Sequence, residues 1–463
     1  MTDMPLTYRS VNPATGVELR RYDTATDAEV GEALDRADAA YRNAWGTLPL
    51  AERTARVAAF GQLFHDRADE LAAIATEEMG KSLKEAAGEA RFSGDIFAYY
   101  ADQAATLLAD QPLTAPGGAS AVVQRRPIGV VLGIMPWNYP YYQVARFAAP
   151  NLVLGNTVVL KHAESVPGSA ALIADLAREA GLPDGVYTNV FASHEQIGRI
   201  IEDPRVQGIS LTGSERAGSA VAARAGAALK KCVLELGGSD PYIVLDTDDV
   251  AAAAQQAWAV RLSNMGQACN SNKRMIVHES IAEAFIAELT LAAKNLVPGD
   301  PSDPTPGTYR PLSSRAAAES LAAQIQDAVE QGATLHAGGT LEPGPGAYLA
   351  PAVLSGVTPQ MRAYREELFG PVAVVYSVRD EDEAVALANA SAYGLGGAVF
   401  STDAERARRV AERLEVGMAN VNTPAGEGTQ IPFGGVKRSG FGRELGPLGI
   451  DEFANKRVFY VEG

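Results

Sequence analysis

From residue 129 onward the chain alternates short apolar runs with amphipathic helical stretches, and this alternation restricts the fold more than any other feature of the sequence. Each run is too short for a buried helix and several are rich in β-branched residues; the first five begin at Gly129, Thr157, Val186, Gly208 and Cys232. Helical segments such as residues 166–180 lie between them. Strands and helices in alternation form a parallel sheet with helices on both faces, and such sheets bind ligands at the carboxyl ends of their strands.

A second block with the same texture begins near Asp240. Strands are expected at residues 240–246, 274–278, 372–378 and 397–401, and helices at residues 281–295, 316–331 and 404–414. Residues 26–107 precede both blocks and are expected to be helical, because apolar residues recur there at intervals of three and four. The expected fold class is therefore α/β, with two doubly wound parallel-sheet lobes whose interface is the default place for a ligand pocket.

Composition excludes several classes of protein. With 47% hydrophobic and 21% charged residues, the 463-residue chain has the composition of a folded globular protein of two large or about three average domains. A net charge of −16 opposes binding to nucleic acid, whose phosphates need a basic surface. The first residues form no signal peptide, and no apolar run approaches the length of a membrane helix, so we expect a cytoplasmic protein with no nucleic-acid or membrane partner.

The two cysteines have different surroundings. Two cysteines cannot build a disulfide framework in a chain of this length, which favours a reducing compartment or thiol chemistry. Cys269 lies in a loop of small and polar residues directly before the strand expected at 274–278, where a substrate can reach it; the alternative is a small buried hydrophobic residue. Cys232 lies inside an apolar strand, and we assign it to packing.

Two further motifs stand at the ends of expected strands. Glu235 precedes a pair of glycines at a strand's carboxyl end, where it can act as a base with a raised pKa; the alternative is an exposed acid or half of an ion pair. The segment from Gly213 to Gly218 is a strand-to-helix turn that presents backbone N–H groups and Ser214 to a phosphate. It lacks the usual Gly-x-Gly-x-x-Gly fingerprint, so plain turn geometry is an equally open interpretation.

Five segments in order carry a resemblance that covers almost the whole chain: MPWNYP (135–140), LELGG (234–238), NMGQAC (264–269), EELFGP (366–371) and PFGGVKRSG (432–440). The sequence resembles the NAD(P)-dependent aldehyde dehydrogenase superfamily. The resemblance implies a cofactor domain from residues 1–109 and 127–236, a catalytic domain from 237–440, and a small β oligomerisation arm from 110–126 and 441–463. The C-terminal strand near residues 458–463 would extend a partner subunit's sheet, giving a homodimer or homotetramer.

The resemblance also implies catalytic roles. Cys269 would be the nucleophile that attacks the aldehyde, and Glu235 would activate the water that hydrolyses the resulting thioester. Asn138 would donate its side-chain amide to the developing oxyanion together with the backbone N–H of Cys269. Glu444 matches a family glutamate near the route by which the proton leaves.

For the cofactor, the resemblance places Lys161 and Glu164 at the adenosine ribose, Ser214 at the pyrophosphate, and Glu367 with Phe369 at the nicotinamide ribose. The expected cofactor contacts are Ile134, Pro136, Trp137, Lys161, Glu164, Gly213, Ser214, Gly218, Glu367 and Phe369. Because a carboxylate at 164 accepts hydrogen bonds from ribose hydroxyls but repels a 2′-phosphate, we expect NAD rather than NADP. His162 departs from the family, which usually has proline there. The five histidines form no spaced cluster with Cys or acidic residues, so no metal is expected.

The substrate is the most open point. Chain length and the Asn-Lys-Arg run after Cys269 look most like the short succinate-semialdehyde dehydrogenase branch, in which Arg146 matches an arginine for the substrate carboxylate. The alternative for Arg146 is a helix-surface arginine paired with an acid. Ser263 stands where many of these enzymes have a second arginine. Tyr142, with its neighbours Tyr139 and Tyr141, would equally line a pocket for an aromatic or aliphatic aldehyde. A CoA-acylating enzyme and a non-catalytic binding protein of the same fold are the remaining alternatives.

Overall fold

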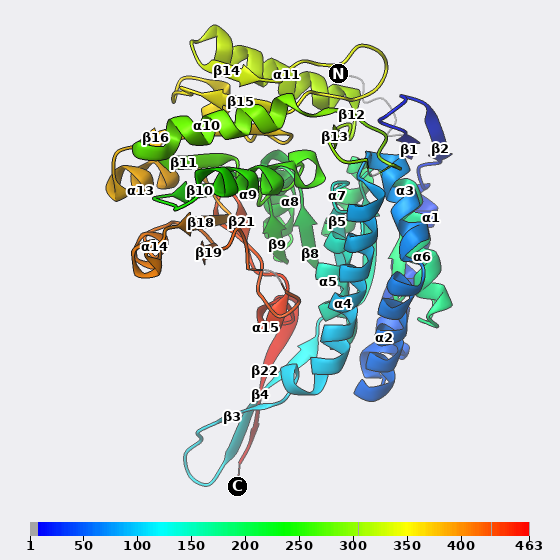
Figure 1. Cartoon of the computed structure of the whole chain (residues 1–463). Helices are drawn as coiled ribbons and strands as arrows, with labels where there is room; N and C mark the ends of the chain where they lie inside the picture. Colours follow the sequence, from blue (N-terminus) through cyan, green and yellow to red (C-terminus); the bar gives the residue numbers. More distant parts are fainter. Residues whose placement is uncertain (1–7, 304, 427, 463) are drawn as a thin grey trace.

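The computed structural model describes residues 8–303, 305–426 and 428–462, which form two α/β lobes and a slender β arm (Figure 1). The sheet of the first lobe has the strand order β21-β9-β8-β5-β6-β7. Its parallel strands are β5 (Val130–Met135), β6 (Thr157–His162), β7 (Tyr187–Asn189), β8 (Val206–Thr212) and β9 (Lys231–Glu235), and β21 (Gly440–Phe441) pairs antiparallel with β9. All five apolar runs of the first block form strands, as the sequence predicts.

Helices cover both faces of this sheet. The connecting helices are α5 (Tyr142–Leu154), α6 (Pro167–Glu179), α7 (His194–Glu202) and α8 (Glu215–Ala227). The predicted helical opening consists of α1 (Asp27–Asn43), α2 (Leu50–Asp66), α3 (Ala68–Met79) and α4 (Leu83–Leu107). The apolar faces of α2, α3 and α4 meet in one core, in which the rings of Phe60 and Phe97 lie 4.7 Å apart and the ring of Phe64 lies 5.4 Å from each. Burial of these faces, rather than helix propensity, holds the long helices against α5. The apolar face of α1 packs in a second core with α7 and α8.

The second lobe is built on a seven-stranded sheet of order β14-β15-β16-β11-β10-β18-β19, parallel except for β14. Its strands are β10 (Pro241–Val244), β11 (Arg274–His278), β14 (Thr334–Ala337), β15 (Ala352–Ser355), β16 (Val372–Val378), β18 (Gly396–Phe400) and β19 (Met418–Val421). Its main helices are α9 (Val250–Leu262), α10 (Glu279–Lys294), α11 (Arg315–Glu330), α13 (Glu381–Asn389) and α14 (Ala404–Ala411). The sequence pattern missed β14, β15 and β19, each only four residues long.

Short elements complete the fold. They are β1 (Tyr8–Val11), β2 (Glu18–Tyr22), β12 (Val297–Pro298), β13 (Thr308–Tyr309), β17 (Tyr393–Gly394), β20 (Val436–Lys437), α12 (Arg362–Arg365), α15 (Gly446–Gly449) and the 3₁₀ turns η1 (Trp45–Thr47) and η2 (Ser263–Gly266). Within the described ranges, no helix is both long enough and apolar enough to cross a membrane.

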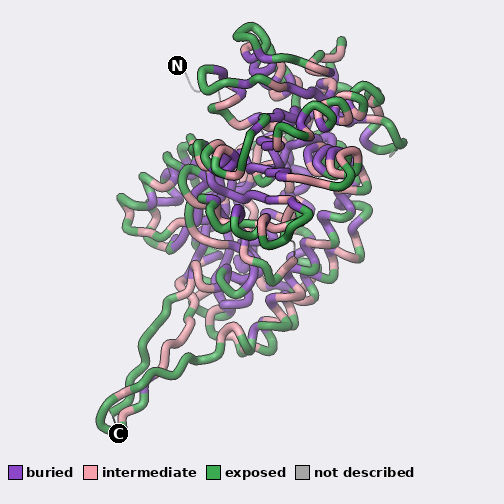
Figure 2. The backbone as a smooth tube through the Cα atoms, turned by 60° about the vertical axis from the view of Figure 1, so that its left-hand side comes forward, coloured by how far each residue is buried: buried purple, intermediate pink, exposed green. Residues whose placement is uncertain are grey.

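The arm is a three-stranded antiparallel sheet of β3 (Gln111–Leu113), β4 (Ser120–Pro127) and β22 (Ala454–Val461) that projects away from both lobes (Figure 1). The sequence predicts a terminal strand at 458–463 with no partner in its own lobe. In the structure this strand begins earlier, at Ala454, and pairs with β4 along its whole length, because the chain end returns to the arm. Most of the arm is exposed (Figure 2), including the side chains of Val458, Phe459 and Tyr460.

The site forms where the carboxyl end of a strand in the first sheet meets the amino end of a strand in the second sheet. Glu235 is the last residue of β9, at the carboxyl end of the first sheet, as the sequence predicts. Cys269 precedes β11, so in the second sheet the thiol lies near the amino end of a strand. In β21, Gly440 pairs with Glu235 of β9, so a segment close to the C-terminus joins the first sheet. The contact between the lobes therefore brings Glu235 and Cys269 to one place.

Candidate active site

The loop before Cys269 is a sharp turn held at both ends. Asn264 and Met265 adopt left-handed backbone angles, with φ of 47° and 54°, which cost energy in residues other than glycine. The side-chain amide of Asn264 donates to the carbonyl of Asn138 at 2.9 Å, and its backbone N–H donates to Oε1 of Glu85 at 2.7 Å. Cys269 is half-buried in this turn and packs against the core of the first lobe. The access of a substrate to its thiol stays a prediction.

Charged groups of both signs surround the thiol of Cys269. Burial raises its pKa to about 11, while the cations of Arg146 and Lys273 act to lower it and the carboxylates of Glu367 and Glu235 act to raise it. The thiolate is the reactive form of cysteine. The balance among these four side chains therefore decides how much reactive thiolate the site holds.

Glu235 is a buried carboxyl group with charged side chains nearby, those of Glu444, Arg146 and Arg443 among them. Its side chain is 1% exposed, and neither carboxylate oxygen has a hydrogen-bond partner among the residues that the structure describes. A Cβ atom on Gly434 would lie 2.7 Å from Oε1 of Glu235, so only glycine leaves room for the carboxyl group there. Burial, followed by repulsion from Glu444, raises the pKa of Glu235 well above its usual range. Such a group can take up a proton near neutral pH.

Arg146 lies inside the protein rather than on a helix surface. Its guanidinium is wholly buried between the rings of Tyr142 and Phe433, at 4.8 and 4.4 Å from their centroids. Its Nε lies 2.7 Å from Oε2 of Glu444, whose other oxygen accepts a hydrogen bond from Ser210 at 3.1 Å. The alternative of a surface arginine is wrong, although its pairing with an acid is present.

Asn138 is fixed beside the cysteine loop. Its amide Nδ2 donates to the carbonyl of Gln267 at 2.9 Å, and its Oδ1 accepts from Nε2 of Gln143 at 3.0 Å. The side-chain amide is thus oriented toward the backbone that carries Cys269, and it is buried. The amide donor therefore lies against the loop that carries Cys269.

The predicted cofactor residues of the first lobe gather at the carboxyl ends of β5, β6 and β8. Ile134 is the last residue but one of β5, and Pro136 and Trp137 follow that strand. Lys161 lies near the end of β6, and Glu164 follows it. Lys161 and Glu164 form an ion pair, and Nε2 of His194 lies 3.4 Å from Oε1 of Glu164. Burial raises the pKa of Glu164, but Lys161 lowers it more, so the side chain is a carboxylate.

The turn after β8 forms the start of a long helix. Gly213 follows the strand, and Ser214 caps α8 by accepting a hydrogen bond from the N–H of Ala217 at 3.3 Å. A Cβ on Gly218 would lie 2.6 Å from the side chain of Leu236, so glycine lets α8 approach the chain beyond β9. A helix N-terminus attracts phosphate oxygens, and Lys161 with Glu164 can bond ribose hydroxyls. This set of donors and acceptors fits a nicotinamide dinucleotide.

Two of the predicted cofactor residues come from the second lobe. The ring of Phe369 meets the ring of Trp137 edge to face, with centroids 5.8 Å apart and planes at 87°. Glu367 accepts a hydrogen bond from the N–H of Gly238 at 3.1 Å. The structure therefore brings residues of both lobes into contact close to the loop of Cys269.

His162, the departure from the family, replaces proline at a contact between the cofactor strand and the loop of Asn138. It is buried, its Nε2 lies 2.9 Å from the carbonyl of Pro140, and its Nδ1 accepts from the N–H of Ala163 at 2.9 Å. Nε2 must then carry the proton. Burial lowers the pKa of His162 to about 4, which keeps the ring neutral. The loop geometry is maintained by this hydrogen bond in place of a proline ring.

The expected substrate residues separate into two groups. Tyr142 lies beside Arg146 and its ring meets that of Tyr139 at 6.1 Å, while the hydroxyl of Tyr139 bonds Ser263. Tyr141 points the other way: its hydroxyl donates to the carbonyl of Leu71 at 2.6 Å inside the helical core. The expectation that Tyr141 lines the pocket is wrong, because neighbouring residues of a helix face different directions.

Sequence reasoning missed the supports of this site. Glu89 on α4 accepts the backbone N–H groups of Tyr141 and Tyr142 at 2.8 and 3.1 Å, and it pairs with the buried Lys81. Lys273 contacts the cysteine loop. In the sequence, Glu89 stands beside the apolar face of an expected helix, and Lys273 belongs to the Asn-Lys-Arg run. These were the signals by which the two residues could have been found.

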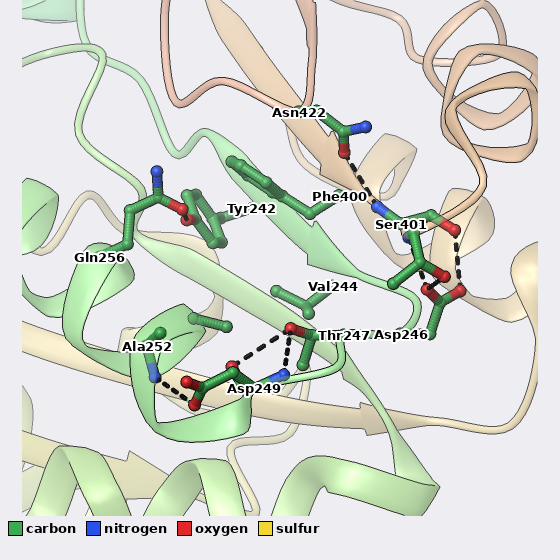
Figure 3. Close-up of a pocket in the computed structure, with 12 residues that line it drawn as sticks. Tyr242, Val244, Asp246, Thr247, Asp249, Ala252, Gln256, Phe400, Ser401 and Asn422 are labelled. Atoms are coloured by element: carbon green, nitrogen blue, oxygen red, sulfur yellow. Dashed lines mark hydrogen bonds between the residues drawn. The ribbon is translucent and has the colours of Figure 1, made fainter.

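A surface pocket of about 460 Å³ lies elsewhere, at the carboxyl ends of β10, β18 and β19 (Figure 3). Its polar groups satisfy one another: Asp246 accepts from the hydroxyls of Ser401 and Thr402, and Tyr242 donates to Gln256. None of the predicted site residues lines it. Within the described part of the chain, no group of three or more His, Cys, Asp or Glu side chains is placed to hold a metal ion.

Comparison with known proteins agrees with this arrangement. Residues 2–459 match the sequence model of the Aldehyde dehydrogenase family. The succinate-semialdehyde dehydrogenase [NADP(+)] of Deinococcus radiodurans is 53% identical over 97% of this chain and 94% of its own, and the succinate semialdehyde dehydrogenase [NAD(P)+] of Escherichia coli is 42% identical over the full length of both. The crystal structure of succinic semialdehyde dehydrogenase from Streptococcus pyogenes in complex with NADP⁺ superposes with a TM-score of 0.95 at 40% identity, covering 98% of this chain and all of that one.

Proposed function

The chain belongs to the aldehyde dehydrogenase family, an enzyme family that oxidises aldehydes with NAD(P), and from this premise we propose that its substrate is succinate semialdehyde. The observation that carries the proposal is the buried cation of Arg146, which lies close enough to Cys269 to act on its thiol. A substrate with a carboxylate at one end and an aldehyde at the other would span these two groups. The names of the similar enzymes support the same substrate.

Cys269 is the proposed nucleophile. Its thiolate attacks the aldehyde carbon to give a thiohemiacetal, whose oxyanion receives hydrogen bonds from the amide of Asn138 and the backbone N–H of Cys269. Bound NAD(P) supplies the acceptor for the hydride that leaves this carbon. Lys161, Glu164 and Ser214 of the first lobe, with Glu367 and Phe369 of the second, are proposed to hold the cofactor; Ile134, Pro136, Trp137, Gly213 and Gly218 form the surrounding wall.

Glu235 is the proposed base for hydrolysis of the thioester left on Cys269. Its unpaired oxygens and raised pKa suit it to take a proton from water as the water attacks the thioester carbon. The acid product and the free thiol of Cys269 are then released. Glu444, whose charge already raises the pKa of Glu235, is proposed to lie on the path by which that proton leaves.

Arg146 is the proposed ligand of the substrate carboxylate. A guanidinium has five N–H groups, and contacts with Glu444, Thr212 and the hydroxyl of Tyr142 use only part of them. Lys273, the other cation that acts on the thiol, already places its ammonium on two carbonyls and a carboxylate. Arg146 is therefore the better placed of the two cations to share its charge with a bound carboxylate.

The test is the formation of NAD(P)H by the purified protein with succinate semialdehyde and with an uncharged aliphatic or aromatic aldehyde. We expect the highest kcat/KM with succinate semialdehyde, and we expect Arg146→Gln to lower it by about 10- to 100-fold, mostly through KM, as expected for loss of one charged hydrogen bond. Butanal has no carboxylate and should lose less activity, because the substitution costs it only the effect of the Arg146 charge on the thiol of Cys269. A preference for an uncharged aldehyde, unaffected by Arg146→Gln, would favour the tyrosine-lined pocket and contradict the proposal.

The cofactor preference depends on Glu164. The names of the relatives favour NADP, whereas a carboxylate beside the adenosine ribose favours NAD, so we propose that both are used and that Glu164 limits NADP. In Glu164→Gln we expect the ratio of kcat/KM for NADP to that for NAD to rise about tenfold, because a repulsion with the 2′-phosphate is removed and Lys161 is freed to bind it. Glu195→Gln, on the exposed first turn of α7, is the control. An unchanged ratio would show that Glu164 does not set the preference.

We also propose that the arm joins two or more copies of this chain. The argument rests on the exposed apolar side chains of β22 (Val458, Phe459, Tyr460 and Val461) and on the free edges of a three-stranded sheet. Light scattering at micromolar concentration should give a mass of at least twice 48.6 kDa. The mass of a single chain would contradict the proposal.

A further inference from the structure

Lys273 is a buried lysine that lies beside the candidate nucleophile and near the buried carboxyl group of Asp240, whose pKa burial raises to about 7 while Lys273 acts to lower it. It stands four residues after Cys269, immediately before β11, and is 2% exposed. Its Nζ donates to the carbonyl of Ala268 at 2.6 Å and to the carbonyl of Cys269 at 2.8 Å, and it lies 3.0 Å from Oε1 of Glu367. An ammonium has three N–H donors, so these three acceptors can use all of them.

The backbone at the end of the first lobe closes the same cluster from the other side. The N–H of Gly238 donates to Oε1 of Glu367, the oxygen that also meets Lys273. A Cβ on Gly238 would lie 2.3 Å from the carbonyl oxygen of Cys269, and one on Gly237 would lie 2.6 Å from Oε2 of Glu367. Because both positions are glycine, the chain at the end of the first lobe packs directly against Glu367 and the carbonyl of Cys269.

Lys273 differs from the other cation near the thiol. Arg146 is paired with Glu444, which lies on the Glu235 side of the site. Lys273 is paired with Glu367, two residues before Phe369, whose ring meets that of Trp137 from the first lobe. The charged groups that face the thiol are Arg146 from α5, Glu235 from β9, Lys273 from the cysteine loop and Glu367 from the loop before β16; the neutral phenols of Tyr139 and Tyr142 also face it.

We propose that Lys273 is a positioning residue that links the carboxylate of Glu367 to the loop of Cys269, holding the backbone of the nucleophile and setting the reactivity of its thiol through this charge pair. The inference rests on the proposed role of Cys269 as nucleophile. Lys273 stabilises the thiolate by its charge, and Glu367 opposes it. Removal of Lys273 should therefore lower the reactivity of the thiol, and removal of Glu367 should raise it. A role in burial or packing alone would not give these opposite effects.

Alkylation of Cys269 by iodoacetamide, without cofactor and over a range of pH, tests this charge pair directly. The extent is read by mass spectrometry on the peptide that contains Cys269, with Cys232 as the internal reference. In Lys273→Met we expect alkylation near neutral pH to be about tenfold slower than in the natural protein, which corresponds to one pKa unit, with the difference closing at alkaline pH. In Glu367→Gln we expect it to be faster, and in the double variant to return toward the natural rate.

Three controls separate this inference from other effects. Lys294→Met, on the exposed last turn of α10, should leave the alkylation unchanged. Lys273→Arg retains the charge and should retain most of the reactivity. If Lys273→Met does not fold, the inference is tested by the rates of alkylation of Cys269 in Glu367→Gln and Lys273→Arg.

An unchanged alkylation rate in Glu367→Gln, or a loss in Lys273→Met that is equal at every pH, would overturn the inference. Failure of the proposed function would appear differently, as aldehyde oxidation that persists in Cys269→Ala.

Discussion

Cys269→Ala is expected to abolish the formation of NAD(P)H from any aldehyde, with a loss in kcat of at least about 10⁴-fold, because no other group in the site can form the covalent intermediate. The substitution removes one sulfur atom from a half-buried residue of a loop, so the fold should be preserved and the melting temperature should change little. A coupled spectrophotometric assay with succinate semialdehyde gives the measurement.

Cys232→Ala is the matched control for this loss. Cys232 lies in β9, on the strand that carries Glu235, and its partly buried thiol has a raised pKa because of burial. We expect full activity in this variant. Substantial residual activity in Cys269→Ala, or loss of activity only in Cys232→Ala, would remove Cys269 from the mechanism.

Glu235→Gln is expected to separate the two halves of the reaction. Oxidation of the aldehyde does not need Glu235, so rapid mixing should show a burst close to one equivalent of NAD(P)H per active site. Hydrolysis should then be slower by about 10²- to 10⁴-fold, the range that a positioned general base contributes. Because both oxygens of Glu235 lack partners, the amide should fit the same cavity without breaking a hydrogen bond.

The control for this variant is Glu412→Gln, an exposed glutamate that follows α14 and pairs with Arg408. It should show no burst and a natural steady-state rate. A Glu235→Gln enzyme that loses the burst as well would place Glu235 in the oxidation step rather than in hydrolysis.

Short apolar runs predicted the strands of the first lobe well. Each of the runs from Gly129 to Cys232 becomes a strand of one sheet, since consecutive buried strands with helical crossovers leave little choice of arrangement. Strands β15 and β19 escaped prediction, although β10, of the same length, was found from the apolar run that continues to Leu245. Strands β1 and β2 pair only with one another, and β2 is mostly exposed, so they carry little apolar signal.

The position of Arg146 could not be predicted, for a physical reason. Helix α5 is packed between the first sheet and the helices α2 and α4, so that nearly all of its residues are buried. A search for one apolar face assumes that the opposite face meets water, and it therefore assigns arginine to the surface. The ion pair with Glu444 joins residues almost 300 positions apart, a separation that no local pattern encodes.

The proposed catalytic residues were identified through family motifs, whereas their supports were not. Lys273 and Glu367 are distant in sequence and meet because they precede β11 and β16, which are neighbouring strands of the second sheet. Domain boundaries and the cytoplasmic location stay predictions. Tyr141, which the sequence allowed as a pocket residue, lies in the core, whereas the next residue, Tyr142, lies beside Arg146, because successive residues at the start of a helix face different directions.

The most direct test of the account is to identify the covalent intermediate. Glu235→Gln mixed with succinate semialdehyde and NAD(P), quenched in acid during the burst and digested, should yield the peptide that contains Cys269 with the added mass of one succinyl group. The same treatment of Cys269→Ala should yield none. A burst of NAD(P)H with no acyl group on Cys269, or with the acyl group on another residue, would contradict the proposed mechanism.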